Sequence, residues 1–176
     1  MMNPTQARLK TFTPEQLIRL AGWSAYASGS VSVMGILFII GMLAFPDPFG
    51  KLNDICVLIQ YALALPLTVA LHWLLKDRAP ALSRAAMWVG ISGMVAIAIL
   101  QYLLVADIIS FTDQVGMVVF AMFVVLGVWF AITGHLGRAT GRLTHSLRMS
   151  FLAWTYLGYP FWAFWIGRQL LKERRL

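Results

Sequence analysis

The sequence predicts an all-α protein, a polytopic membrane bundle of about five transmembrane helices. Five long apolar blocks fill the 176 residues, of which 60% are apolar and only 12% charged. A soluble domain of this size carries about a quarter charged residues. Because a helix rises about 1.5 Å per residue, blocks of about 19 to 23 residues can cross a hydrocarbon core of about 30 Å. The blocks cover residues 23–45, 55–75, 85–106, 115–133 and 149–167.

These blocks and their short connections use nearly the whole chain, so we expect residues 1–176 to form a single membrane domain. Inside lipid the backbone has no water to bond, and helices satisfy it internally. The first block is longer than the 7–15-residue core of a signal peptide, and we interpret it as an uncleaved span. The sequence has no internal repeat that would indicate an inverted-repeat transporter.

The first two helices have recognisable boundaries. Thr13 and Gln16 have the spacing of a capping box, and the proline between them fits the first helical position. Helix 1 is expected to end before Pro46, because proline cannot continue a helix. A short turn over 49–54 follows, and either Asn53 or Asp54 is expected to cap helix 2.

Charged or polar loops separate the remaining blocks. The segment 76–84 is rich in charge, and Ser83 is the expected cap of helix 3. Residues 107–113 separate helices 3 and 4, with Thr112 or Asp113 as the next cap. The fifth block contains Pro160 and eight aromatic residues. We expect this block to cross the membrane, and the alternative is a half-span or an interfacial helix.

The distribution of Lys and Arg predicts the orientation. With five spans, the N-terminal segment and the loops 76–84 and 134–148 lie on one side and carry nine of these residues, whereas the loops on the other side carry only Lys51. Cytoplasmic loops are enriched in Lys and Arg, so we expect a multi-pass protein of the cytoplasmic (inner) membrane with a cytoplasmic N-terminus. The basic C-terminal tail conflicts with this rule, because a fifth crossing places it outside.

Two faces of small residues predict close helix packing. One combines Ala21, Ala25 and Gly29 in helix 1, and the other combines Gly90 and Gly93 with Ala86 in helix 3. Small residues let membrane helices approach closely. We interpret both faces as packing surfaces within the chain, with homo-oligomerisation as the alternative.

A few polar groups within the spans are the best candidates for a ligand site. Gln60 precedes the loop 76–84 by about 15 residues and Gln101 follows it by about 17, so in an antiparallel hairpin their depths differ by only about 3 Å. Polar groups in lipid are costly and often functional. They can meet in a hydrogen bond between helices or line a ligand or ion site. The candidate ligand-binding residues are Gln60, Gln101, Tyr102, Asp107, Trp154 and Tyr156.

Motifs of catalysis and of cofactor binding are absent from the sequence. It has no G-x-S-x-G, P-loop or H-E-x-x-H motif, and no basic run with interleaved aromatics that would indicate nucleic-acid binding. The only cysteine is Cys56, and the three histidines have no short ligand spacing. We therefore expect no cofactor, no metal and no nucleic-acid partner.

Two segments resemble the domain-of-unknown-function 4386-like family of uncharacterised bacterial multi-pass proteins. The first is the run from Arg19 to Gly22, and the second extends from Val118 to Gly127 before a Gly/Arg loop and a last aromatic span. The chain departs from the family pattern because residues 137–143 lack a proline. The resemblance implies a helical membrane bundle and assigns no activity.

Together these features predict a non-enzymatic integral membrane protein. It would bind a lipid or another small apolar ligand, or serve as an accessory subunit beside a membrane-protein partner or further copies of itself. One alternative is a small oligomeric transporter or channel, since five helices barely enclose a pathway. Another is a membrane enzyme acting on a lipid or isoprenoid substrate, with Asp107 or His135 as its acid–base group.

Overall fold

The computed structural model is an all-α bundle, which confirms the predicted fold class. It describes residues 13–143, 145–153 and 155–173, and this part of the chain contains no β-strand. The elements are α1 (Pro14–Met42), α2 (Pro46–Leu75), α3 (Pro80–Val105), α4 (Phe111–Val119), the π-helix η1 (Phe120–Leu126), α5 (Gly127–Thr140), α6 (Ser146–Ala153) and α7 (Tyr159–Glu173).

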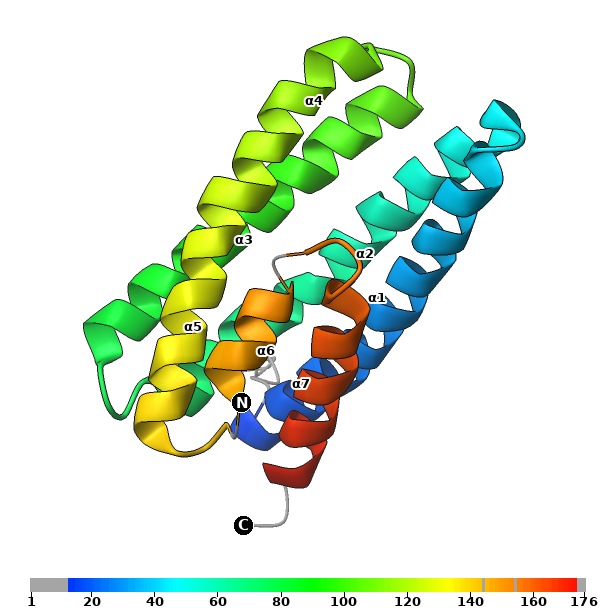
Figure 1. Cartoon of the computed structure of the whole chain (residues 1–176). Helices are drawn as coiled ribbons and strands as arrows, with labels where there is room; N and C mark the ends of the chain where they lie inside the picture. The colour runs from blue at the N-terminus through cyan, green and yellow to red at the C-terminus, as the bar shows by residue number, and fades with distance from the viewer. Residues whose placement is uncertain (1–12, 144, 154, 174–176) are drawn as a thin grey trace, which may run out of the picture.

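Four helical segments of the described chain are long and apolar enough to cross a membrane. They are α1, α2 from Pro48, α3, and the continuous run of α4, η1 and α5 from Phe111 to Thr140. Each has 26 to 30 residues, which corresponds to about 39–45 Å of helix. The four segments alternate in direction along the bundle (Figure 1). All four segments begin before the corresponding predicted blocks, and only the fourth ends beyond its block.

The helix starts agree with the sequence patterns in part. The capping box of α1 is confirmed, since the Thr13 amide donates to Gln16 Oε1 at 3.0 Å and the Gln16 amide donates to Thr13 Oγ1 at 3.3 Å. The expected caps of the next two helices are wrong, because proline at the first helical position starts α2 at Pro46 and α3 at Pro80. Helix α4 is capped by Ser110 rather than by Thr112 or Asp113.

The fifth block, 149–167, forms a returning hairpin instead of one continuous span, so the count of five spans holds only approximately. Helix α6 has 8 residues and α7 has 15, or about 12 and 22 Å, and each is shorter than the hydrocarbon core. The turn 155–158 joins them about half-way along the bundle (Figure 1). The half-span alternative from the sequence describes this block better than the full crossing.

Local chemistry explains why the helix breaks at this turn. Thr155 Oγ1 donates to the Leu152 carbonyl at 2.8 Å and accepts a hydrogen bond from the Gly158 amide at 3.0 Å. At Gly158 a Cβ atom would lie 1.9 Å from the Leu152 oxygen, so only glycine fits. Pro160 then occupies the second position of α7, where its missing N–H costs nothing.

The returning hairpin brings both ends of the described chain to the same end of the bundle (Figure 1). Nine of the ten described Lys and Arg residues lie towards this end, which we call the basic end, and Lys51 lies at the opposite end. A fifth crossing would have placed the basic C-terminal tail at the opposite end, against the Lys and Arg rule. Because α7 returns to the basic end, this conflict is removed. At the opposite end Lys51 forms an ion pair with Asp107 at 2.9 Å, which links the start of α2 to the loop after α3.

The small-residue faces pack inside the molecule. Every residue of the helix 1 face is buried, and α7 lies against it so closely that a Cβ at Gly167 would lie 2.9 Å from the Gly22 oxygen. On α3, Gly90 faces the indole of Trp129 and Gly93 faces Leu126. These contacts show that both faces serve packing within the chain.

Candidate functional site

A polar cluster surrounds the turn of the returning hairpin in the interior of the bundle. Tyr156 Oη donates to Asn53 Oδ1 at 2.9 Å, and Tyr159 Oη lies 2.7 Å from Ser28 Oγ. Ser28 donates its only hydroxyl proton to the Gln60 carbonyl at 3.0 Å, so Tyr159 must be the donor to Ser28. These bonds join α1, α2 and α7, and they hold the turn at its depth.

A small cavity of about 20 Å³ lies beside this cluster. Its polar lining residues are Gln60, Tyr61, Thr155, Tyr156 and Tyr159, and residues of η1, α5 and α6 supply apolar side chains. The Gln60 side-chain oxygen is buried and has no hydrogen-bond partner in the described part of the chain. The volume is about that needed for one water molecule, and a lipid does not fit.

The two glutamines behave alike, although they do not bond to each other. Gln60 is 2% exposed and Gln101 is 5% exposed, so both face the interior, as expected for polar side chains in lipid. Neither side-chain oxygen accepts a hydrogen bond from any described residue, which excludes a bond between the pair. Gln114 on α4 is also buried with its amide nitrogen unpartnered. Their assignment to a ligand site stays a prediction.

The other predicted ligand residues do not share one site. Tyr102 is 59% exposed on the outer surface of α3. Asp107 is exposed in its ion pair with Lys51 and adopts a left-handed backbone with φ of 56°. Tyr156 belongs to the polar cluster, whereas Trp154 lies outside the described residues. Of the five described residues in the predicted set, the structure brings together only Gln60 and Tyr156.

The acid–base candidates lie at opposite ends of the bundle. Asp107 is in the loop between α3 and α4, and His135 is an exposed residue near the basic end of α5. His72 is a structural residue, because its Nδ1 lies 3.0 Å from Ser83 Oγ, whose proton goes to the His72 carbonyl. Among the described residues, no group of three or more His, Cys, Asp or Glu side chains is arranged to hold a metal ion.

An apolar groove of about 300 Å³ lies on the other side of the returning hairpin, between η1 and α5 on one wall and α6 on the other. We call it the α5–α6 groove. Large exposed side chains border it, including Val124, Val128 and Phe151, so it is open on the surface of the bundle. Its volume is at the lower limit of typical small-molecule sites. The lining residues are Val124, Gly127, Val128, Phe130, Ala131, Leu147, Ser150 and Phe151.

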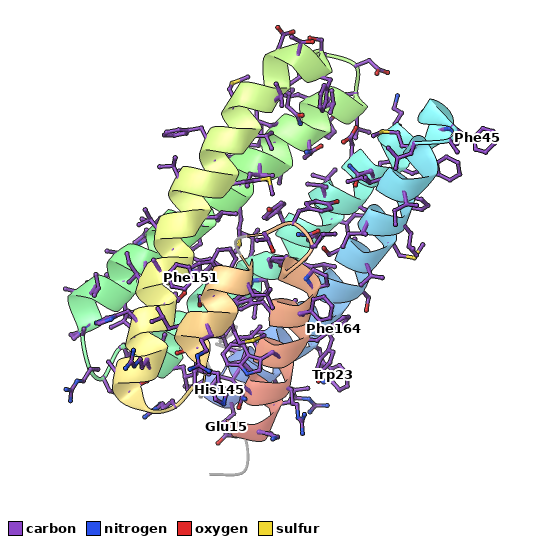
Figure 2. All side chains as sticks on the ribbon, in the orientation of Figure 1. Glu15, Trp23, Phe45, His145, Phe151 and Phe164 are labelled. Atoms are coloured by element: carbon purple, nitrogen blue, oxygen red, sulfur yellow. The ribbon has the colours of Figure 1, made fainter. Side chains whose placement is uncertain are left out.

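A second hollow, of about 340 Å³, lies at the basic end of α6 and is lined by Arg138, His145, Ser146, Leu147 and Arg148. We call it the basic pocket. Leu147 lines both the basic pocket and the α5–α6 groove, so the two adjoin along α6. Figure 2 shows the same order, with His145 at the start of α6 and Phe151 further along it.

The loop arginines differ in what they contact. Arg142 donates to the Leu74 carbonyl at 3.2 Å and pairs with Asp77 at 3.0 Å, so it fastens the loop to α2. Arg138 and Arg148 line the basic pocket and have no acidic partner among the described residues. Sequence reasoning used these arginines only to assign orientation. Their ten-residue spacing across a loop gives no signal that they share a pocket.

The fold and these features define a class: a multi-pass integral membrane protein built from four long apolar helices and a returning hairpin. Comparisons with protein-family models, with curated proteins and with solved structures found no match for the chain.

Proposed function

We propose that this protein is a non-enzymatic membrane protein that binds a lipid or another small apolar ligand in the α5–α6 groove. The observation that carries the proposal is the groove itself, which is almost entirely apolar and open on the surface of a bundle that lies in lipid. The π-helix η1 forms part of its wall, and π-helical segments occur frequently at functional sites. Because the groove opens towards the surrounding lipid, a membrane lipid is the expected ligand.

The charge distribution supports an orientation with the basic end in the cytoplasm. Nine of the ten described Lys and Arg residues lie towards that end, as the positive-inside rule requires. In a cell with an inner membrane, the protein would be a multi-pass protein of that membrane with its N-terminal end cytoplasmic. We also propose that the chain is related to the domain-of-unknown-function 4386-like family, whose expected helical membrane bundle is compatible with the fold of this chain.

A small oligomeric transporter or channel is the second candidate, and the returning hairpin favours it. Non-helical backbone at membrane depth is found where it is buried in protein or lines a cavity, and broken helices form the sites of many transporters. The turn 155–158 and the small cavity beside Gln60 fit this pattern. A cavity of about 20 Å³ is too small for a pathway, so transport would require a different conformation or several copies.

Native mass spectrometry of the purified protein tests the proposed function. We expect bound lipid to persist after detergent exchange, and we expect Ala131→Phe to remove it, because the larger ring fills the groove. The matched control is Ala85→Phe, since Ala85 is exposed on α3 outside the groove. Equal lipid retention by both variants would place the lipid elsewhere and contradict the proposal. A defined oligomer without retained lipid would favour transport instead.

A further inference from the structure

We infer that the ligand is an anionic lipid of the leaflet at the basic end, with its phosphate head group in the basic pocket and one acyl chain in the α5–α6 groove. The inference rests on the proposed function, and it names the class of ligand that the groove accepts. Its basis is that the basic pocket and the apolar α5–α6 groove both border α6 and share Leu147 as a lining residue.

The head-group end has two arginines that the fold leaves available. Arg138 comes from the last turn of α5 and Arg148 from the first turn of α6, so the pocket has a cation on each side. Both are exposed and have no acidic partner in the described chain, whereas Arg142 between them is occupied by Asp77 and the Leu74 carbonyl. Arginine favours phosphate because its planar guanidinium presents paired donors.

Helix α6 adds to this preference through its direction. Its first residues, Ser146, Leu147 and Arg148, line the basic pocket. The Ser146 N–H donates to the Leu143 carbonyl at 3.3 Å. The N-terminus of a helix still carries positive partial charge, so an anion is favoured there. A zwitterionic head group such as that of phosphatidylcholine gains less, because its own cation offsets the charge of its phosphate beside the two arginines.

The α5–α6 groove has the position that the acyl chain of such a lipid requires. Helix α6 leads from the basic end to the turn about half-way along the bundle (Figure 1). Its residues Leu147, Ser150 and Phe151 line the groove along this path. A lipid whose head group lies in the basic pocket therefore places its chain beside Phe151 and Val128. Basic pockets between membrane helices on the cytoplasmic side bind anionic head groups in this way.

Lipid binding to the full-length protein, measured by native mass spectrometry, tests the inference. The probes are phosphatidylglycerol and phosphatidylcholine with identical acyl chains, added separately at several concentrations. We expect phosphatidylglycerol to bind the wild type at least about tenfold more tightly. In Arg138→Gln/Arg148→Gln the preference should fall to about onefold, because each arginine near an anionic surface contributes about a fivefold factor. The matched control Arg78→Gln removes a charge at the same end outside the pocket and should keep the preference.

The outcomes separate the inference from the proposed function. Equal binding of the two lipids to the wild type, both abolished by Ala131→Phe, would refute the anionic-lipid inference and leave the groove as an apolar site. Binding of neither lipid would refute both. Displacement of phosphatidylglycerol by an equal concentration of glycerol 3-phosphate would show that the acyl chain contributes nothing, which also overturns the inference. A preference that Arg78→Gln reduces as much as the double variant would assign it to overall charge rather than to the pocket.

Discussion

The fourth and fifth apolar blocks have the same length in the sequence, but only the fourth forms a continuous helical segment. The fourth continues through α4, η1 and α5 as one segment of 30 residues, although a π-helix interrupts its regular geometry. The fifth stops after 8 residues and returns as α7. The comparison shows that apolar length permits a crossing but does not impose one. Turn-forming residues break the helix in the middle of the fifth block, and its two helices are also less apolar than those of the fourth.

The two blocks differ in the residues at their centres. Between Phe120 and Leu126 the fourth block has only apolar side chains and lacks the Gly, Pro, Ser or Thr residues that would close a turn. The fifth has Thr155, Gly158 and Pro160 within six positions, and their hydrogen bonds and backbone geometry close a turn. Lipid tolerates such a turn only when its polar groups find partners. Tyr159 has a buried bond to Ser28, and Tyr156 has a part-buried bond to Asn53.

The largest effect is expected from Gly158→Ala, which attacks the turn itself. The added Cβ would lie 1.9 Å from the Leu152 oxygen, so the hairpin must open or shift, and we expect a loss of about 3 kcal/mol in stability. The measurement is thermal unfolding in detergent, followed by tryptophan fluorescence. The control in the crossing block is Gly116→Ala, whose Cβ meets nothing within 4 Å and should be neutral or stabilising by up to about 1 kcal/mol. Similar effects of the two substitutions would mean that the turn is not closed as described.

A smaller effect is expected from Tyr159→Phe, which removes the bond that anchors α7 to α1. Hydrogen bonds between membrane helices contribute about 0.6 kcal/mol on average, and buried bonds in soluble proteins about 1 kcal/mol. We expect a loss in this range, because the packing of the ring against Trp162 remains. Tyr102→Phe is the matched control on the exposed surface of α3, and it should leave the unfolding temperature unchanged. An unfolding temperature unaffected by Tyr159→Phe would argue against the anchoring bond.

The smallest effect on stability is expected from Gln60→Leu, which borders the returning hairpin. Its side-chain oxygen is buried without a partner in the described chain, so its removal relieves an uncompensated polar group. Stability should stay the same or rise by less than about 1 kcal/mol, and Gln101→Leu should behave alike for the same reason. A clear loss of stability in unfolding assays would show that a bound water or ligand satisfies Gln60. That result would support a ligand-binding role for the small cavity beside Gln60.

The sequence predicts the fold class, the four long helices and the buried small-residue faces, because hydropathy and residue size are local properties. Pro160 in the sequence also indicates that the helix of the fifth block can be interrupted. The sequence does not show that Tyr159 reaches Ser28, since a contact between residues 131 positions apart depends on how α7 packs. The sequence does not show the basic pocket for a similar reason. Arg138 and Arg148 line the same pocket only because of how the loop joins α5 to α6. Asp107 was a candidate ligand residue in the loop 107–113, and the structure places it in a surface ion pair with Lys51.

The sidedness of the two chain ends tests the returning hairpin most directly. A reporter that fluoresces only in the cytoplasm and one that is active only outside it are each fused to the N-terminus and to the C-terminus of the full-length chain. Because α7 returns to the end of the bundle where α1 begins, we expect both ends to give the same reporter signal, and the basic end predicts the cytoplasmic one. Opposite signals at the two ends would show that the fifth block crosses the membrane and would contradict the hairpin.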